Sequence, residues 1–439
     1  MSSERDRKRQ KVSQALARVP YETFRSIRKL LQDGDSSKAD VKKDDWGYGK
    51  KVAQSILRSF MDCYALITFP ACAGCEFSEI RAYLGKVDEI LSLALQESIE
   101  FKQSFVQGPG STGEISLIVY SDETTGGNVL QVASSKKLHL VHIHVDGVMN
   151  PLREEAWLPL MALPNRDLKF IRGGFSAVLK VIVLSLDTAT VSLTIDGRRR
   201  QFTLKLKSFV GDYDALCKGF QAKSASALKP CFLCQNVLMR DSEVASVDAH
   251  FVTVASHRVR DFVPVCHEDL VATFDHMRQY VNASKAVRAH QEMMFGFGID
   301  TGSILACPRA RDRLHIDHCL FDSMHCYYSK GITSQEILLV AGNLQERCGV
   351  SVESLKRSAM EVPWCTSVPA VRAPSARGML FEPKFFEGSM YHGSATQLWY
   401  ALPLFSYYVD KLTAGMDIPE LQSFKALVQA AWRDREGFQ

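Results

Sequence analysis

The sequence predicts an α/β protein in which a mixed β-sheet is flanked by helices. Three runs with strand-like alternation follow one another, ISLIVYSDE, KLHLVHIHV and EAWLPLMAL. The apolar run FSAVLKVIVLSL comes next and suits a buried helix, although a strand also fits it. After it, VSLTIDGRRRQFTLKL indicates a hairpin with Asp196 and Gly197 at its turn. The order is therefore three strands, a helix and a further pair of strands.

The rest of the chain divides into regions by composition and periodicity. Residues 1–45 form a basic, largely disordered tail with one short helix, and residues 46–110 a helical N-terminal domain with apolar stripes at helical spacing. The sheet core begins within residues 111–230, an irregular insertion follows over 231–314, and residues 315–439 are expected to supply a helical second half of the core.

Composition limits the setting of the protein. The net charge of +4 over 439 residues is mild, so the overall charge selects no partner. The most apolar run, from Ala177, is too short to span a bilayer and contains Lys180, so we expect no membrane association. Twelve cysteines without a secretory signal indicate reduced thiols in the cytosol or nucleus. The basic run between Arg5 and Lys11 is a candidate nuclear-import signal, which favours the nucleus; a solvated tail is the other interpretation.

Two carboxylates occupy positions that suit a divalent metal. Three strands, a helix and a further strand make the first half of an RNase H-like domain, in which one acid ends the first strand and another follows the fourth. In this chain those acids are Asp122 and Asp212, with Asp214 close behind. Phosphodiester chemistry uses Mg²⁺ or Mn²⁺ held by such acids. The alternative interpretation is that all three are ordinary turn and loop residues.

A zinc site is the second chemical prediction. Cys231 and Cys234 have the Cys-x-x-Cys spacing of zinc ligands, and His318 and His325 are candidates to complete the site. The pair Cys266 and His267 is held in reserve. Two buried free cysteines are the competing interpretation.

The order of these motifs resembles the RNase H-like (DDE/D) transposases of cut-and-paste DNA elements, and in particular element-derived proteins with a CxxC zinc-binding insertion. The resemblance covers roughly residues 115–412. It is carried by four stretches, Tyr120-Ser-Asp122-Glu-Thr-Thr-Gly-Gly-Asn128, Gly211-Asp212-Tyr-Asp214-Ala215, Lys229-Pro-Cys231-Phe-Leu-Cys234 and Phe321-Asp322-Ser-Met-His325.

The resemblance implies a catalytic core that acts on DNA, with Asp122 and Asp212 as metal ligands and Cys231, Cys234 and His325 in a zinc site. A Glu is expected on a late helix, but the matching position holds Gln397, which carries no charge. Asp322 is the candidate replacement, and Glu336 is a further one that a capping box (residues 333–336) already explains.

Three functions remain open from the sequence. The leading hypothesis is a nuclear, transposase-derived DNA-binding protein whose third catalytic acid is degenerate. The alternatives are an active two-metal transposase or nuclease that uses Asp122, Asp212 and Asp322, and a zinc-stabilised interaction scaffold without DNA activity. Assembly into a homo-oligomer stays open as well.

Overall fold

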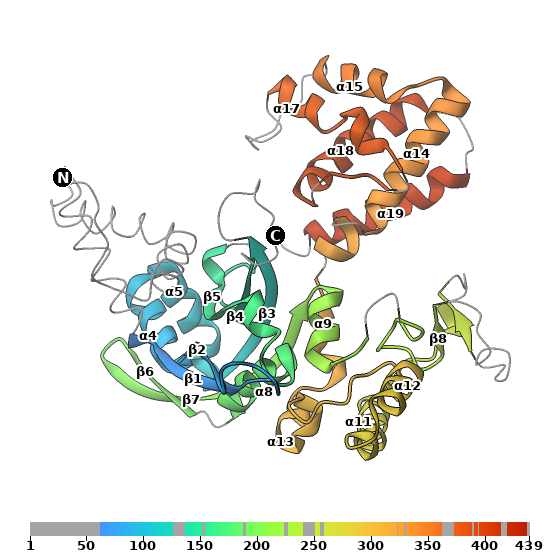
Figure 1. Ribbon diagram of the computed structural model, residues 1–439. Helices are drawn as coiled ribbons and strands as arrows, with labels where there is room; N and C mark the ends of the chain where they lie inside the picture. Colours follow the sequence, from blue (N-terminus) through green and yellow to red (C-terminus); the bar gives the residue numbers. More distant parts are fainter. Residues whose placement is uncertain are drawn as a thin grey trace, which may run out of the picture. The chain divides into compact units, whose positions relative to one another are not determined.

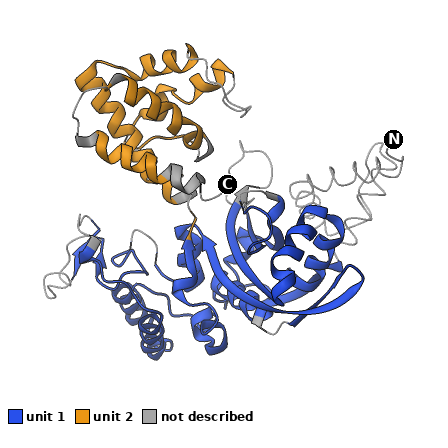
Figure 2. Cartoon of the chain, turned by 180° about the vertical axis from the view of Figure 1, so that it is seen from behind, with its two compact units in different colours: residues 1–320 blue, residues 321–439 orange. Residues whose placement is uncertain are grey.

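The computed structural model describes residues 62–125, 137–151, 154–187, 190–223, 227–239, 251–254, 259–322, 324–328, 331–361, 373–388, 390–393, 395–413 and 419–436. The chain divides into two compact units, residues 1–320 and 321–439 (Figure 2). The expected N-terminal tail and the Gly-rich turn after residue 125 lie outside the described residues.

The first unit is built on one curled mixed sheet with helices packed along it (Figure 1). The strand order is β1-β2-β5-β4-β3-β7-β10, with β6 paired to β7. Strands β3 and β7 are parallel, whereas β1–β2, β2–β5, β5–β4, β4–β3 and β6–β7 are antiparallel. The strands are β1 (Tyr64–Pro70), β2 (Glu79–Gly85), β3 (Glu114–Thr125), β4 (Lys137–Val145), β5 (Leu158–Pro164), β6 (Thr190–Ile195), β7 (Arg198–Gly211) and β10 (Cys319–Phe321).

Helices cover this sheet and connect its strands. The helix α8 links β5 to the β6–β7 hairpin and packs on β7, and its ring of Phe175 lies 6.2 Å from that of Phe209. The predicted helix over the apolar run is therefore confirmed. The helices among the described residues of the first unit are α4 (Val87–Glu97), α5 (Ile99–Gln107), α6 (Pro109–Thr112), α7 (Asn165–Leu168), α8 (Gly174–Asp187), α9 (Tyr213–Phe220), α11 (His267–Met277), α12 (Lys285–Phe295) and α13 (Pro308–Arg311).

The centre of the sheet forms the core because β3 alternates as the sequence predicts. Ile115, Leu117 and Val119 are at most 1% exposed, while the residues between them are half-buried. The predicted hairpin is also confirmed. Its turn residues Asp196 and Gly197 both have positive φ, 50° and 75°, which is the conformation that an Asp-Gly hairpin turn requires.

The expectation of a helical N-terminal domain is wrong for residues 64–85. They form the hairpin β1–β2, which joins the main sheet through β5, and only α4 to α6 follow as helices. The stripe of Ile80 and Leu84 fits a helix, but the small Ala82 between them is buried as well, so the same residues also alternate as a strand.

Between α9 and β10 the chain leaves the sheet and forms a lobe, which Figure 1 draws beside α9. The short strands β8 (Val237–Leu238) and β9 (Val252–Thr253) pair in parallel, and α11 and α12 follow. Backbone hydrogen bonds from Gln235 to Val263 and from Val265 to Leu233 tie the Cys-x-x-Cys segment to the stretch before α11.

The second unit is helical. Its core includes Phe381, Phe405 and Phe424, each at most 1% exposed. Its described helices are α14 (Ile332–Cys348), α15 (Val352–Glu361), α17 (Pro374–Met379), α18 (Ala395–Leu412) and α19 (Pro419–Glu436), after a π-helical turn, Met324–Tyr328. The last helix buries one apolar face, made by Leu421, Phe424, Leu427 and Val428.

The capping box predicted at the start of α14 is wrong. The N-cap is Gly331 without a side-chain bond, and Thr333 lies inside the helix, buried. The carboxylate of Glu336 instead accepts a hydrogen bond from the Ser423 hydroxyl of α19 at 3.1 Å. Among the described helices of the chain, none is both long and apolar enough to cross a membrane.

Candidate functional site

The candidate site begins with Asp122 and Asp212, which the parallel pairing of β3 and β7 brings together. Ser121 of β3 is the register partner of Gly211 of β7. Asp122 and Asp212 are the residues that follow these two in the sequence. Since paired strands lie about 4.8 Å apart, we expect the two Cα atoms to be separated by about 5 Å. Ninety residues of sequence separate them, so sheet topology alone produces this pair of acids.

Asp212 also has a local structural role. It ends β7 with extended backbone (φ −68°, ψ 169°) and is the N-cap of α9, where its Oδ1 accepts a hydrogen bond from the Ala215 N–H at 2.6 Å. An N-cap uses one carboxylate oxygen, so Oδ2 is the atom left for another ligand. The loop-residue interpretation of Asp212 is therefore correct in part.

Asp122 lies within β3 and is half-buried. Strand alternation turns its side chain away from the face of the buried Ser121 and toward the face of Tyr120, whose ring packs on Trp157 at 5.4 Å. The sequence suggested that Asp122 ends this strand. The strand instead continues to Thr125, so Asp122 lies three residues before its end.

The opposite face of the same strand end carries an acid that sequence reasoning missed. Glu123 Oε1 accepts a hydrogen bond from Lys218 Nζ of α9 at 2.9 Å, and Lys218 also pairs with Asp214 at 2.5 Å. Burial lowers the pKa of Lys218, but the hydrogen bonds to Asp214 and Glu123 outweigh it, and the pKa is raised. Asp214 thus neutralises a helix lysine. The helical i, i+4 spacing to Lys218 was a visible signal for this pair.

A buried polar pair supports β3 from behind the site. The Ser121 hydroxyl and His139 Nε2 are 2.6 Å apart, and both side chains are at most 2% exposed. Burial lowers the pKa of His139 to about 4, so the imidazole is neutral near pH 7. Its ring contacts Phe175 of α8 at 4.2 Å, which fixes β4 to the helix layer.

The third acid is not supplied within the described residues of the first unit, where no group of three Asp, Glu, His or Cys side chains is placed to hold a metal ion. Asp322 belongs to the second unit and directly follows β10, the strand next to β7 in the sheet. Gln397 lies in the first turn of α18 and is half-buried.

The predicted zinc ligands are only partly brought together. Cys231 and Cys234 line a pocket of about 350 Å³ with Lys229, and burial and the Cys231 thiol raise the pKa of Cys234 to about 12. His318 lies in a different pocket, beside His315. The side chain of His325 lies outside what the structure describes.

The reserve ligands have other partners. The Cys266 thiol is the N-cap of α11 and accepts a hydrogen bond from the Asp269 N–H. The buried His267 accepts one from the Ile316 N–H at Nδ1 and stacks on His315 at 4.1 Å.

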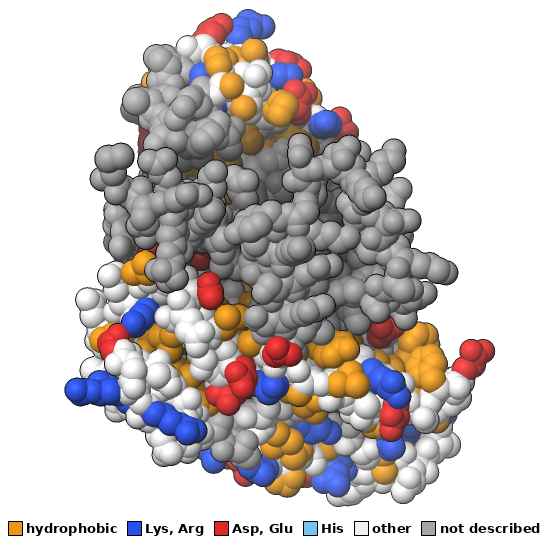
Figure 3. Space-filling view, turned by 90° about the vertical axis from the view of Figure 1, so that its left-hand side faces the viewer, with side chains coloured by type: hydrophobic (Ala, Val, Ile, Leu, Met, Phe, Trp, Pro, Cys, Tyr) orange, Lys and Arg blue, Asp and Glu red, His pale blue; other side chains and the backbone are white. Residues whose placement is uncertain are grey.

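Several arginines of the first unit are engaged with other groups of the protein. Arg199 donates to the Ser192 hydroxyl and Arg200 to the Gly110 carbonyl, while Arg311 pairs with Asp275. On the face drawn in Figure 3, Lys and Arg side chains of the described residues are interspersed with Asp and Glu. Any contact with a polyanion therefore depends on local sites.

No model of a known protein family matches the chain, and a search of curated proteins finds no match either.

Proposed function

We propose that this chain is a transposase-derived DNA-binding protein whose first unit is an RNase H-like core. The observation that carries the proposal is the pairing of Ser121 with Gly211 in two neighbouring parallel strands, which brings the next residues, Asp122 and Asp212, together. Along the chain, the antiparallel strands β3, β4 and β5 are followed by α8 and then by the hairpin of β6 and β7, in which β7 is parallel to β3. That is the order expected from the resemblance described above.

The two carboxylates suit an open Mg²⁺ or Mn²⁺ site better than a site whose ligands all come from the protein. Magnesium is commonly held by one or two carboxylates, with water and substrate phosphate completing its coordination. When bound, such an ion neutralises phosphate charge and polarises the scissile bond. The residues of this chain then have two tasks, Asp122 offering a carboxylate from a rigid strand and Asp212 offering Oδ2 while Oδ1 holds α9.

Binding rather than cleavage is the function we propose for the pair. The uncharged Gln397 occupies the position where the resemblance implies a Glu, and Asp322 and Glu336 are the acids that the sequence offers in its place. A structural zinc ion held by Cys231 and Cys234 belongs to the same proposal, without His318, which lies in a different pocket.

DNA affinity measured with and without divalent ions tests the proposal. A labelled duplex should bind with an affinity that falls steeply between 50 and 200 mM salt, by about tenfold or more. Addition of Mn²⁺ should tighten binding in the unmodified protein and in the control Asp214→Asn, whose acid is exposed and pairs with Lys218. In Asp122→Asn the Mn²⁺ effect should vanish.

Two outcomes would contradict the proposal. Absence of DNA binding even at low salt would favour the scaffold alternative. An unchanged Mn²⁺ effect in Asp122→Asn would exclude this acid as a ligand. Nicking of supercoiled plasmid in Mg²⁺ or Mn²⁺, abolished by Asp122→Asn, would instead establish the active-nuclease alternative.

A further inference from the structure

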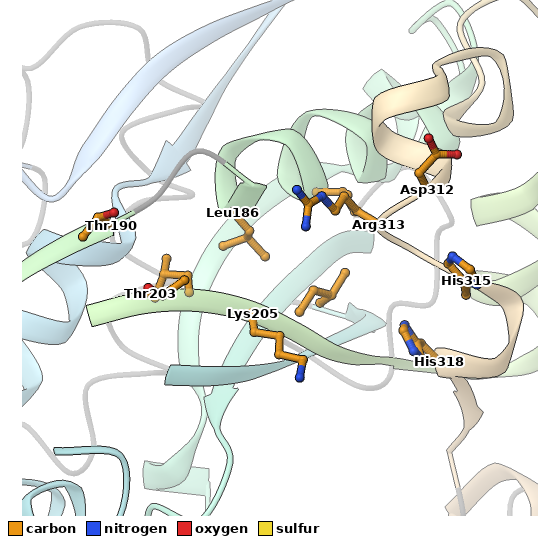
Figure 4. Close-up of a pocket in the computed structure, with 11 residues that line it drawn as sticks. Leu186, Thr190, Thr203, Lys205, Asp312, Arg313, His315 and His318 are labelled. Atoms are coloured by element: carbon orange, nitrogen blue, oxygen red, sulfur yellow. The ribbon is translucent and has the colours of Figure 1, made fainter. Parts of the chain in front are cut away.

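A second pocket of the first unit lies away from the carboxylate pair. Its volume is about 460 Å³, within the range of small-molecule sites. The walls come from the end of α8, the start of β6, the middle of β7 and the segment of residues 312–318, as Figure 4 shows. Seven residues of strand separate Lys205 from Asp212, or about 23 Å along β7. The pocket is therefore a separate site.

The lining combines an apolar floor with cationic groups. Val183, Leu186 and Leu204 are buried and supply the floor. Lys205 and Arg313 carry the positive charges, and both are exposed. In Figure 4 Arg313 reaches from its segment toward Leu186, while Asp312, the one carboxylate of the lining, points toward the upper edge of the view.

Two histidines complete one wall in a fixed arrangement. The His315 ring stacks on the buried His267 ring at 4.1 Å with an interplanar angle of 15°, and the His318 ring lies 5.6 Å from that of His315. His267 Nδ1 itself accepts a hydrogen bond from the Ile316 N–H at 3.3 Å. Imidazole N–H groups here can donate hydrogen bonds without rearrangement of the chain.

We propose that this pocket binds a phosphate group of its ligand. Lys and Arg are the side chains that recognise phosphate, and the histidines and the hydroxyls of Thr190 and Thr203 add further hydrogen-bond donors. The contact of Lys205 with Glu114 is 3.8 Å long and exposed, so a phosphate can displace it. The apolar floor indicates an organic phosphate, which is either a free nucleotide-like molecule or one unit of a nucleic-acid strand.

The proposal does not depend on the carboxylate pair, and the experiment keeps the two apart. Titration calorimetry of the full chain with inorganic pyrophosphate in EDTA measures the pocket alone. Lys205→Ala combined with Arg313→Ala should weaken binding about tenfold or more, and Arg313→Glu should abolish it. Lys207→Ala is the matched control, because Lys207 lies two residues along the same strand but bonds Asp146 at 2.6 Å. Asp122→Asn should bind pyrophosphate normally.

A second arm identifies the source of the phosphate. If the double variant also loses affinity for a labelled single-stranded oligonucleotide, and pyrophosphate competes with that oligonucleotide, the phosphate belongs to a nucleic-acid strand. If only pyrophosphate binding falls, the ligand is a free phosphate compound. Undetectable pyrophosphate binding at millimolar concentration, or equal binding by the unmodified protein and the folded double variant, would overturn the assignment.

Discussion

Replacement of Asp212 by Asn keeps a hydrogen-bond acceptor at the start of α9 and removes the negative charge, whereas replacement by Ala removes both. Asp212 Oδ1 accepts the Ala215 N–H at 2.6 Å, and the helix it caps buries Leu216 and Phe220 completely. The two substitutions therefore separate the structural role of this residue from its role as a metal ligand.

The expected magnitudes differ between the two measurements. Loss of an N-cap costs about 1 kcal/mol, and Asn caps a helix about as well as Asp does. In a unit of this size that cost lowers the melting temperature by about 3 °C for Asp212→Ala and by almost nothing for Asp212→Asn. Loss of one of two carboxylates should weaken Mn²⁺ binding about tenfold or more, about 1.4 kcal/mol, in both variants.

Differential scanning fluorimetry and Mn²⁺ titration followed by electron paramagnetic resonance give the two readouts. Equal destabilisation by Asn and Ala would refute the capping argument. Mn²⁺ affinity that is unchanged in both variants would refute the metal argument, whatever the melting temperatures show. Asp146→Asn is a suitable control, because Asp146 is a partly exposed acid of the same unit that pairs with Lys207.

Three further predictions concern other parts of the fold. Burial lowers the pKa of His139 to about 4, so below about pH 6.5 the unfolded chain binds a proton that the native state does not bind. The free energy of unfolding should therefore fall between pH 6.5 and 4, by at most about 3 kcal/mol. Urea unfolding of His139→Gln should show a weaker dependence on pH. A Cβ on Gly302 would lie 2.5 Å from the Arg172 carbonyl oxygen, so Gly302→Ala should cost about 1–3 kcal/mol, whereas Gly342→Ala, in open space on α14, should not destabilise the protein by thermal melting. If zinc is bound, elemental analysis should find about one Zn²⁺ per chain in the purified protein. Cys231→Ser should remove the zinc, and Cys348→Ser should not. Unmodified protein that is folded but contains no metal would contradict the assignment.

The central strands were predictable because their signals are local. Alternation in residues 115–119 and the Asp-Gly turn between β6 and β7 each require only neighbours in sequence. The hairpin β1–β2 was not predictable in this way. Its apolar spacing fits both a helix and a strand, and its pairing partner β5 lies more than seventy residues further along the chain.

The candidate site was predictable in its residues but not in its environment. Asp122 and Asp212 follow from the order of elements, because a strand parallel to β3 must present its C-terminal end at the same edge. The hydrogen bond between Glu123 and Lys218 joins residues 95 positions apart and depends on how α9 packs, which no local pattern encodes.

The N-cap of α9 accounts for Asp212, whereas the position of Asp122 inside a strand is unusual for an aspartate, and this difference bears on the functional hypothesis. An N-cap is one of the commonest positions for Asp, so α9 alone accounts for Asp212. Aspartate is depleted inside strands, yet Asp122 lies within a twelve-residue strand at the middle of the sheet. A metal-binding role explains both positions with one requirement, which is why Asp122→Asn is the decisive substitution.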